Sequence, residues 1–231
     1  MKYFGTNLSE KHKELNKIIR NSDKIQDAKK LFFEIHSDLH LSEVYQMNYN
    51  AVDELIDDLL DNEYRIMPTS KDETIAWILW HIARIEDVTM GILVAEEKQV
   101  FSKEWKERIN TDIIDTGNAM IDDEIMDFSK KVNIKELLKY RNAVGKRTSE
   151  IVKGICSEKM TMRVDKNNLD RILLEGGVTQ DKGSFELLEF WGKKDIAGLL
   201  LMPPTRHELM HLNNCYRLKE SIRSRKKFFR N

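Results

Sequence analysis

The chain has 231 residues, enough for one large domain with a substantial buried core. It carries 38 Lys and Arg against 39 Asp and Glu, and this near-zero balance gives no general attraction to nucleic acid or anionic membranes. It contains no apolar run of membrane-spanning length, no signal-peptide pattern at its start, and only two cysteines, Cys156 and Cys215. We therefore expect a single cytoplasmic domain over residues 1–231, with no nucleic-acid or membrane partner.

The first long helix is expected from about Asp23 to Glu63. No glycine occurs between Gly5 and Gly91, and Pro68 is the only proline there, so little interrupts a helical pattern in this part of the chain. Asp23 and Gln26 have the spacing of a capping box, in which two side chains satisfy the free amides of a helix start. One apolar stripe supports the helix: Leu31, Ile35, Leu39, Leu55 and Leu59.

The second helix is expected to begin at Ser70, with Glu73 again at capping-box spacing. It reads ETIAWILWHIARIEDVTMGILVAEE and is apolar around most of its circumference near Trp77 to Ile85. A helix that is apolar on all sides is a buried one. This segment is therefore predicted to lie at the centre of the domain.

Two further long helices are expected in the second half of the chain. One begins at Asn133, after a turn at Asp115–Asn118, and continues to about Ile155. The glycine-punctuated residues 160–192 then form an excursion in which FELLEFW is one short helix. The last helix covers 195–229 and is broken at Pro203-Pro204. Four long helices with long connections and no convincing strand pattern indicate an all-α four-helix bundle.

Three histidines are the strongest functional signal. His207 and His211 are four residues apart, so on a helix both imidazoles reach the same ion. His81 interrupts the most apolar helix of the chain, where a buried polar ring is costly unless a partner or a metal satisfies it. Three histidines from two helices predict a metal site with an open coordination position, which is typical of catalytic rather than structural centres.

A second HxxxH pair, His36 and His40, lies on the first predicted helix. Its neighbours Ser37, Asp38 and Ser42 are polar, while the apolar stripe passes beside it. We expect these two histidines near the edge of the core, at the mouth of a pocket, with metal ligation as the less favoured alternative.

The segment His207-Glu208-Leu209-Met210-His211 also matches the HExxH signature of metalloproteases, in which the glutamate is the general base. No HxxGxxH extension follows and no sheet precedes it, and Thr205 with Glu208 has capping-box spacing. A protease is therefore a minor alternative. Glu208 and His211 form only one ExxH unit, so di-iron chemistry, which needs two, is not expected.

Other polar residues near the predicted site have candidate roles. Asn214 continues the helical face of His207 and His211, which suggests a hydrogen bond to a ligand. Arg84, about one turn beyond His81, and Arg206 are candidates for binding an anionic substrate or for structural ion pairs. The seven Lys and Arg after residue 216 are interpreted as a solvated helix end, with contact to nucleic acid or a membrane as the minor alternative.

Three segments together resemble the DinB-like superfamily of metal-dependent helical enzymes: TIAWILWHIARIEDVTM, RNAVGKRT and LLLMPPTRHELMHLN. The resemblance extends over nearly the whole chain. It implies an up-down-down-up four-helix bundle, often a homodimer, that binds zinc or nickel through His81, His207 and His211. Relatives have an arginine and a glycine soon after the last ligand, where this chain has Leu212-Asn213-Asn214. Substrate preference is therefore not transferred.

The resemblance also implies a function. Characterised members of the superfamily include transferases and isomerases that use low-molecular-weight thiols such as bacillithiol or mycothiol. We therefore expect a metal-dependent enzyme acting on a small-molecule substrate, either a transferase with such a thiol as co-substrate or a hydrolase. The alternative from a different class is a non-catalytic bundle that binds metal or a partner. A fourth protein ligand, or the lack of a cavity beside the histidines, would favour that alternative.

Overall fold

The computed structural model describes residues 6–226, with side chains from residue 7 to residue 224. The basic side chains from Arg225 onward, and residues 227–231 altogether, lie outside this part. The α-helices are α1 Thr6–Ile18, α2 Ile25–Asp38, α3 Ala51–Asp57, α4 Ile75–Asp87, α5 Lys103–Ile109, α6 Asp122–Lys131, α7 Ile134–Gly154, α8 Lys166–Leu174, α9 Lys182–Gly192, α10 Ile196–Leu200 and α11 Glu208–Lys226. Two π-helical turns, Val88–Val94 and Met202–His207, follow α4 and precede α11.

The prediction of an all-α protein is confirmed for the described residues. They form no strand, and the only sheet-like contact among them is an isolated antiparallel bridge between Arg163 and Asp195. The helix expected at FELLEFW is present as α9. The helix expected from Asn133 is α7, where Asn133 accepts the backbone amide of Glu136 as predicted.

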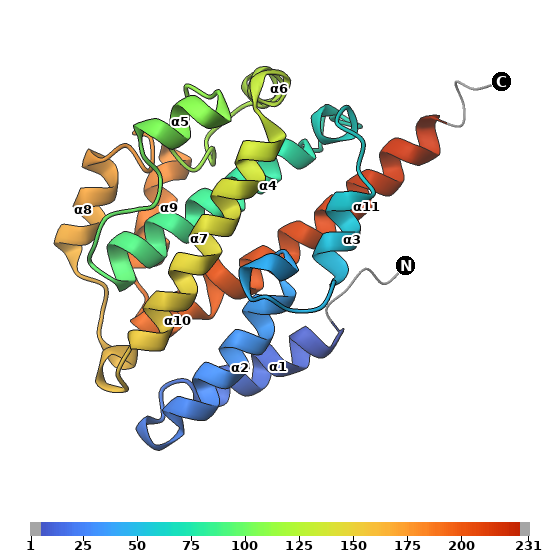
Figure 1. The fold of residues 1–231 in the computed structure, drawn as a ribbon. Coiled ribbons are helices and arrows are strands. Elements are labelled where there is room, and N and C mark those ends of the chain that lie inside the picture. Colours follow the sequence, from blue (N-terminus) through green and yellow to red (C-terminus); the bar gives the residue numbers. More distant parts are fainter. Residues whose placement is uncertain (1–5, 227–231) are drawn as a thin grey trace.

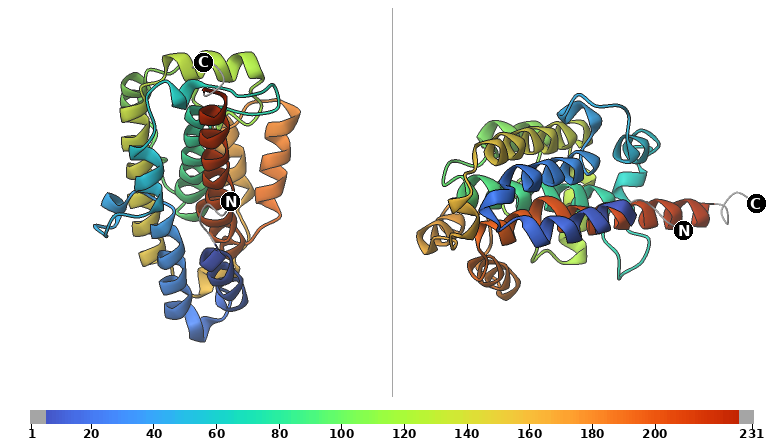
Figure 2. Two further views of the ribbon diagram at one scale, coloured as in Figure 1. Left: turned by 90° about the vertical axis from the view of Figure 1, so that its right-hand side faces the viewer. Right: turned by 90° about the horizontal axis from the view of Figure 1, so that it is seen from below.

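Helix α4 lies at the centre of the molecule, as its composition predicted. Every residue from Ile75 to Asp87 is buried, and the π-turn Val88–Val94 continues this buried segment. It packs against α7 on one side and against α11 on another, and α2 in turn packs against α1 and α7. Figures 1 and 2 show α4 enclosed among the longer helices, while α5, α8 and α9 lie at one side of the molecule.

The long helix predicted over residues 23–63 is wrong in its middle. The chain instead forms α2, an irregular segment and the short helix α3. Asn50 explains the interruption, because its side chain serves two helix ends at once. Its Oδ1 accepts the amides of Val52 and Asp53 at the start of α3, and its Nδ2 donates to the carbonyl of His40 just beyond α2. These bonds satisfy backbone groups that a continuous helix would pair internally.

Two predicted helix starts are also wrong. Lys24 precedes α2 without a side-chain cap, so Asp23 and Gln26 form no capping box. Helix α4 begins after Thr74, not at Ser70, and the hydroxyl of Thr74 accepts the amide of Trp77 at 3.0 Å. Thr74 also bonds the hydroxyl of Ser129 at 2.6 Å, which fixes the start of α4 against α6.

The predicted interruption at Pro203-Pro204 is present, but as a wide π-helical turn between α10 and α11. The prolines lie in its first positions, where a missing N–H is tolerated. Since Pro204 cannot donate to the carbonyl of Leu200, Thr205 does so through its hydroxyl at 2.9 Å. The helical path therefore continues past the prolines and carries His207 into the core.

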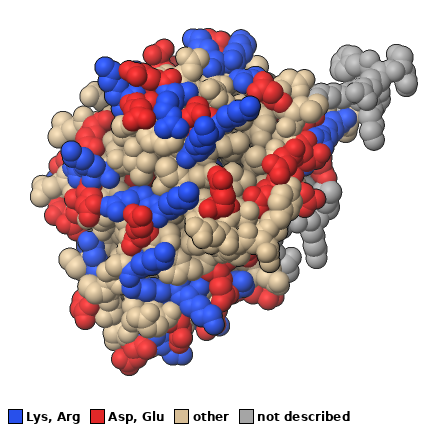
Figure 3. All heavy atoms as spheres, in the orientation of Figure 1, with Lys and Arg blue, Asp and Glu red and all other residues tan. Residues whose placement is uncertain are grey.

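The N-terminal helix α1 was not predicted. Its histidine, His12, is partly buried, and its Nε2 lies 2.7 Å from the carbonyl oxygen of Leu201. On the face drawn in Figure 3, acidic and basic side chains are interspersed, in keeping with the net charge of −1. Within residues 6–226, no helix combines the length and the apolar composition that a membrane span requires.

Candidate metal centre

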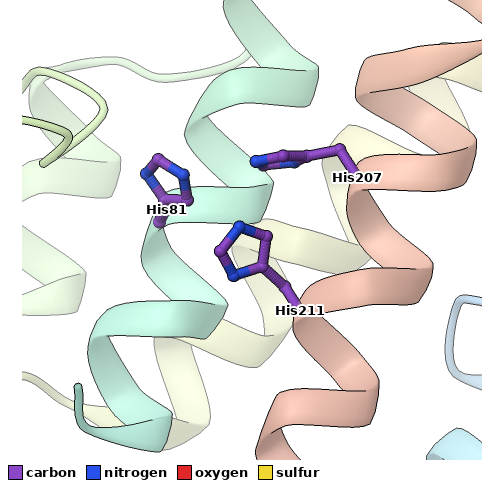
Figure 4. Close-up of side chains that lie close together, drawn as sticks. All are labelled: His81, His207 and His211. Atoms are coloured by element: carbon purple, nitrogen blue, oxygen red, sulfur yellow. The ribbon is translucent and has the colours of Figure 1, made fainter. Parts of the chain in front are cut away.

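The three predicted ligand histidines lie together in the structure. His81 comes from α4, His207 from the π-turn and His211 from the first turn of α11, and Figure 4 shows their rings converging on the space between the two helices. The ring centroids are 5.1 Å apart for His81 and His207, 5.0 Å for His81 and His211, and 4.4 Å for His207 and His211. One nitrogen of each ring lies within 4.8 Å of the others. This geometry suits three ligands of one ion.

The orientation of His81 is fixed by a turn that the sequence predicted at residues 115–118. Its Nδ1 lies 2.8 Å from the carbonyl oxygen of Thr116 and must donate the hydrogen, because a carbonyl only accepts. The ring also stacks on Trp77, with centroids 4.7 Å apart and an angle of 10° between the planes. In this tautomer Nε2 keeps its lone pair, as a metal ligand requires.

The same turn is bonded to α4 at two more points. Trp77 and Trp80 donate their indole N–H groups to the carbonyls of Gly117 and Asp115, at 3.2 and 3.0 Å. Gly117 has a φ of +71°, and a Cβ there would lie 2.9 Å from the Trp77 indole nitrogen. A glycine is therefore required for the turn to approach α4 closely enough to hold His81.

All three rings are held in the neutral form that binds metal. Burial, with a smaller contribution from the neighbouring His211, lowers the pKa of His81 to about 3. Burial also lowers the pKa of His211 to about 4. The pKa of His207 is held well below its usual value by burial and by the two adjacent histidines. Protons therefore compete weakly for these nitrogens at neutral pH.

The three histidines open onto a cavity of about 380 Å³. Apart from them, Asn118 is the one non-aromatic polar side chain among the described residues of its lining. Helix α9, from the predicted excursion, closes one side of this space. The remaining lining residues are apolar or aromatic: Trp77, Ile85, Leu187, Phe190, Trp191, Met202 and Pro203. Such a hollow, apolar and with few polar groups at its base, is typical of small-molecule sites.

These residues fit a divalent metal ion. The donor set is three neutral imidazoles, and Nδ1 of His207 is buried without a hydrogen-bond partner among the described residues. A buried ring nitrogen without a partner is costly, and a coordinated ion is one way to satisfy it. The cavity leaves room for a further ligand beside the three imidazoles.

Of the two roles considered for Arg84, the structure supports the structural ion pair. The guanidinium is buried and donates to Asp87 at 3.0 Å, to the hydroxyl of Tyr140 at 2.9 Å and to the carbonyl of Ile114 at 2.7 Å. It also lies over the ring of Phe101, 4.5 Å from the centroid. Arg84 is therefore a structural ion-pair residue that joins α4 to the segments around it.

Arg206 and Asn214 also lie away from the three histidines. Arg206 is exposed and lines a different hollow of about 640 Å³ beside α1. Asn214 donates to Glu73 at 3.1 Å and accepts from Arg217 at 2.8 Å, so it links α11 to the segment before α4. Asn214 is thus engaged by Glu73 and Arg217, and Arg206 is not among the residues that line the histidine cavity.

Glu208 neither forms the predicted capping box with Thr205 nor lies where the general base of a protease would. Thr205 bonds Leu200, so the predicted capping box is absent, and the buried carboxylate of Glu208 pairs with Arg141 of α7 at 2.7 Å. Burial raises the pKa of Glu208 to about 8; the nearby Glu86 acts in the same direction and Arg141 opposes it. A side chain engaged with α7 is not placed as the general base of a protease.

His36 and His40 do not lie at a pocket mouth, contrary to the prediction. Both are completely buried and face Glu86 of α4, with Nε2 of His36 and His40 at 2.8 and 3.2 Å from its two carboxylate oxygens. The sequence reasoning missed Glu86, although it interrupts the same apolar helix as His81. The cost of burying a polar group would have identified it too.

We compared the sequence with models of known protein families and with curated proteins. A family model described as the DinB superfamily matches residues 45–178, which include His81 and end before His207 and His211. No curated protein matches the chain. The match covers more than half of the 231 residues. The chain therefore belongs to the DinB superfamily.

Proposed function

We propose that this protein is a metal-dependent enzyme that binds zinc or nickel through His81, His207 and His211. One observation carries the proposal: three neutral imidazoles from two helices converge at the base of an apolar cavity. Metal-binding bundles without catalysis have no need of a hollow beside the ligands. A divalent ion in such a position supplies a Lewis acid that can lower the pKa of a thiol or water.

The proposed reaction class is transfer of a low-molecular-weight thiol to a small electrophile. The cavity supports it because its walls are apolar and aromatic, which suits an electrophile with an apolar body. Trp77 and Trp191 would bind that body by ring contact. Asn118 is the one non-aromatic polar side chain among the described residues of the wall and would orient it through a hydrogen bond. Exclusion of water by these walls would favour sulfur over water as the attacking group.

The metal part of the proposal is tested by metal analysis of the purified chain. Wild type, His81→Ala and His207→Ala are compared by mass spectrometry of total metal per chain. We expect each variant to lose the zinc or nickel that wild type carries, because two imidazoles bind far more weakly than three. Equal metal content in all three proteins would refute the centre.

The catalytic part needs a separate assay. Bacillithiol, mycothiol and glutathione are each offered with monochlorobimane, and fluorescence reports the new carbon–sulfur bond. The thiol loses its proton to solvent, and its sulfur bonds to the bimane carbon from which chloride leaves. We expect a rate above the uncatalysed reaction with at least one thiol, and its loss in His207→Ala. Metal binding without such a rate would leave the hydrolase or a non-catalytic metal-binding bundle as the better interpretation.

We further propose, from the resemblance, that the chain is one domain with the up-down-down-up order of α2, α4, α7 and α11. Their positions in Figure 1 support this order. We also propose a homodimer in the cytoplasm. Light scattering during size-exclusion chromatography tests the assembly, with a mass near twice 27.2 kDa expected. Cell fractionation tests the location.

A further inference from the structure

A second cluster of metal-ligating side chains lies in the interior, away from the cavity. It consists of His36 and His40 of α2 and Glu86 of α4, which we call the α2 cluster. All three side chains are 0% exposed. One potential ligand atom from each lies within 4.8 Å of the others.

The spacing inside the α2 cluster agrees with three ligands of one ion. Nε2 of His36 and of His40 lie 2.8 and 3.2 Å from the Glu86 carboxylate oxygens, and the two ring centroids are 4.2 Å apart. Ligand atoms about 2.1 Å from one ion lie about 3.0 Å apart at right angles and about 3.4 Å apart in a tetrahedron. Only small shifts would therefore bring the three groups around an ion.

The hydrogen-bond partner of His36 at Nδ1 is also of the kind that metal-ligating histidines have. Its Nδ1 lies 2.6 Å from the hydroxyl oxygen of Tyr45, which can accept a hydrogen from it. In the structure Nε2 donates to Glu86 at 2.8 Å; with an ion in place of that bond, Nδ1 would donate to Tyr45 and Nε2 would offer its lone pair to the ion. Ligating histidines commonly donate their other N–H to such a partner, which fixes the ring and makes the ligand more basic.

The surroundings hold an unusual number of polar atoms without partners. Among the described residues, Nε and Nη1 of Arg141, whose charge acts on His40, are buried without a hydrogen-bond partner. Nδ1 of His40 has none either. Buried polar atoms are ordinarily satisfied, so a group of them points to bound water or an ion.

The backbone of α7 is adapted to the cluster. Gly145 faces His40 so closely that a Cβ would lie 2.6 Å from its Nδ1 and 2.8 Å from its Cε1. Glycine inside a helix costs about 1 kcal/mol relative to alanine. The helix accepts this cost at the one position where His40 needs the space.

We propose that the α2 cluster is a second metal site, distinct from the three-histidine centre, for a divalent first-row transition ion. Two imidazoles and one carboxylate form the ligand set of non-haem Fe(II) sites, and they differ from the all-imidazole set of the first centre. Glu208 lies beside Glu86 and can approach as a second carboxylate. Because the ligands are fully buried, the ion is structural and exchanges slowly.

The experiment measures total metal per chain in protein from cells grown with added cobalt, after extensive dialysis. Four proteins are compared: wild type, His36→Gln/His40→Gln, His207→Gln/His211→Gln and the control His12→Gln, whose histidine belongs to neither cluster. We expect two ions in wild type and in the control, and one in each double variant. The ion that remains in His207→Gln/His211→Gln should resist EDTA, since its ligands are buried.

Two results would overturn the second site. One is a His207→Gln/His211→Gln protein that binds no ion, and this result decides the question even when the buried His36→Gln/His40→Gln variant fails to fold. The other is a folded His36→Gln/His40→Gln protein with as many ions as wild type. A wild type with one ion that only the His36→Gln/His40→Gln change removes would support the α2 cluster and refute the three-histidine centre.

Discussion

Replacing Gly145 by alanine tests whether His40 is held rigidly in the core. An added Cβ would lie 2.6 Å from Nδ1 of His40, about 1 Å closer than an unstrained contact. The ring cannot retreat freely, because its Nε2 is bonded to Glu86 at 3.2 Å and His36 lies on another side. A shift of about 1 Å would break the bond to Glu86.

The expected magnitude follows from three effects. Overpacking a core costs about 1–3 kcal/mol, and loss of a hydrogen bond to a charged group costs about 1.5–3 kcal/mol. Alanine returns about 1 kcal/mol through its better helix propensity. We therefore expect Gly145→Ala to lower the free energy of unfolding by about 2–4 kcal/mol. For a chain of this length, Tm should fall by about 5–15 °C.

Gly154→Ala is the matched control. Gly154 is the last residue of the same helix, it is exposed, and a Cβ there would meet nothing within 4 Å. This substitution should leave stability unchanged or raise it by up to about 1 kcal/mol. Urea denaturation followed by circular dichroism compares both variants with wild type. If Gly145→Ala proves as stable as wild type, the His40 ring is not held rigidly between Glu86, His36 and α7.

Three further outcomes concern other contacts. Arg141→Met should cost about 2–3 kcal/mol, because it leaves buried Glu208 and the carbonyl of Leu39 without their donor, whereas Glu208→Gln should cost about 1 kcal/mol because an amide oxygen still accepts from Arg141. Urea denaturation showing the reverse order would contradict this. Asn50→Ala should cost about 1–3 kcal/mol of unfolding free energy. Asn50→Asp should cost less, because aspartate retains the cap of α3 and loses only the bond to His40. Equal losses of stability in thermal melts would contradict the proposal that Asn50 bonds both α3 and His40. Hydrogen bonds from two cations of α11 lower the pKa of Asp58, so its stabilisation is present above about pH 4 and is lost as pH falls further. The Tm difference between wild type and Asp58→Asn should therefore be positive at pH 7 and shrink steadily as pH falls below about 4; a constant difference would contradict it.

The features that the sequence predicted correctly depend on local chemistry. The apolar circumference of α4 indicated a buried helix, and the spacing of His207 and His211 placed two rings on one face. The turn at Asp115–Asn118 was predicted from residue types, and it is this turn that orients His81. Each of these signals lies within a few residues of the group that it describes.

The features that the sequence reasoning missed depend on contacts between distant segments. The break after α2 is stabilised by Asn50, whose amide reaches back ten residues to His40. Arg84 was a candidate for substrate binding until its partners on α7 and in the loop at Ile114 were known. Spacing on one helix cannot show which neighbouring helix a side chain will meet.

The HExxH segment shows how adjacent residues can serve different sites. Neighbouring positions on a helix differ by about 100° in direction, so His207 can face the cavity while Glu208 faces Arg141 of α7. In α4, His81 and Glu86 are likewise five residues apart, which is about 140° around the helix, and they belong to different clusters. Helices α4 and α11 thus present the three-histidine centre on one face and Glu86 with Glu208 on another. A substitution at Glu208 should therefore disturb the α2 cluster and Arg141 more than the three-histidine centre. In an HExxH protease, loss of that glutamate would instead abolish catalysis directly.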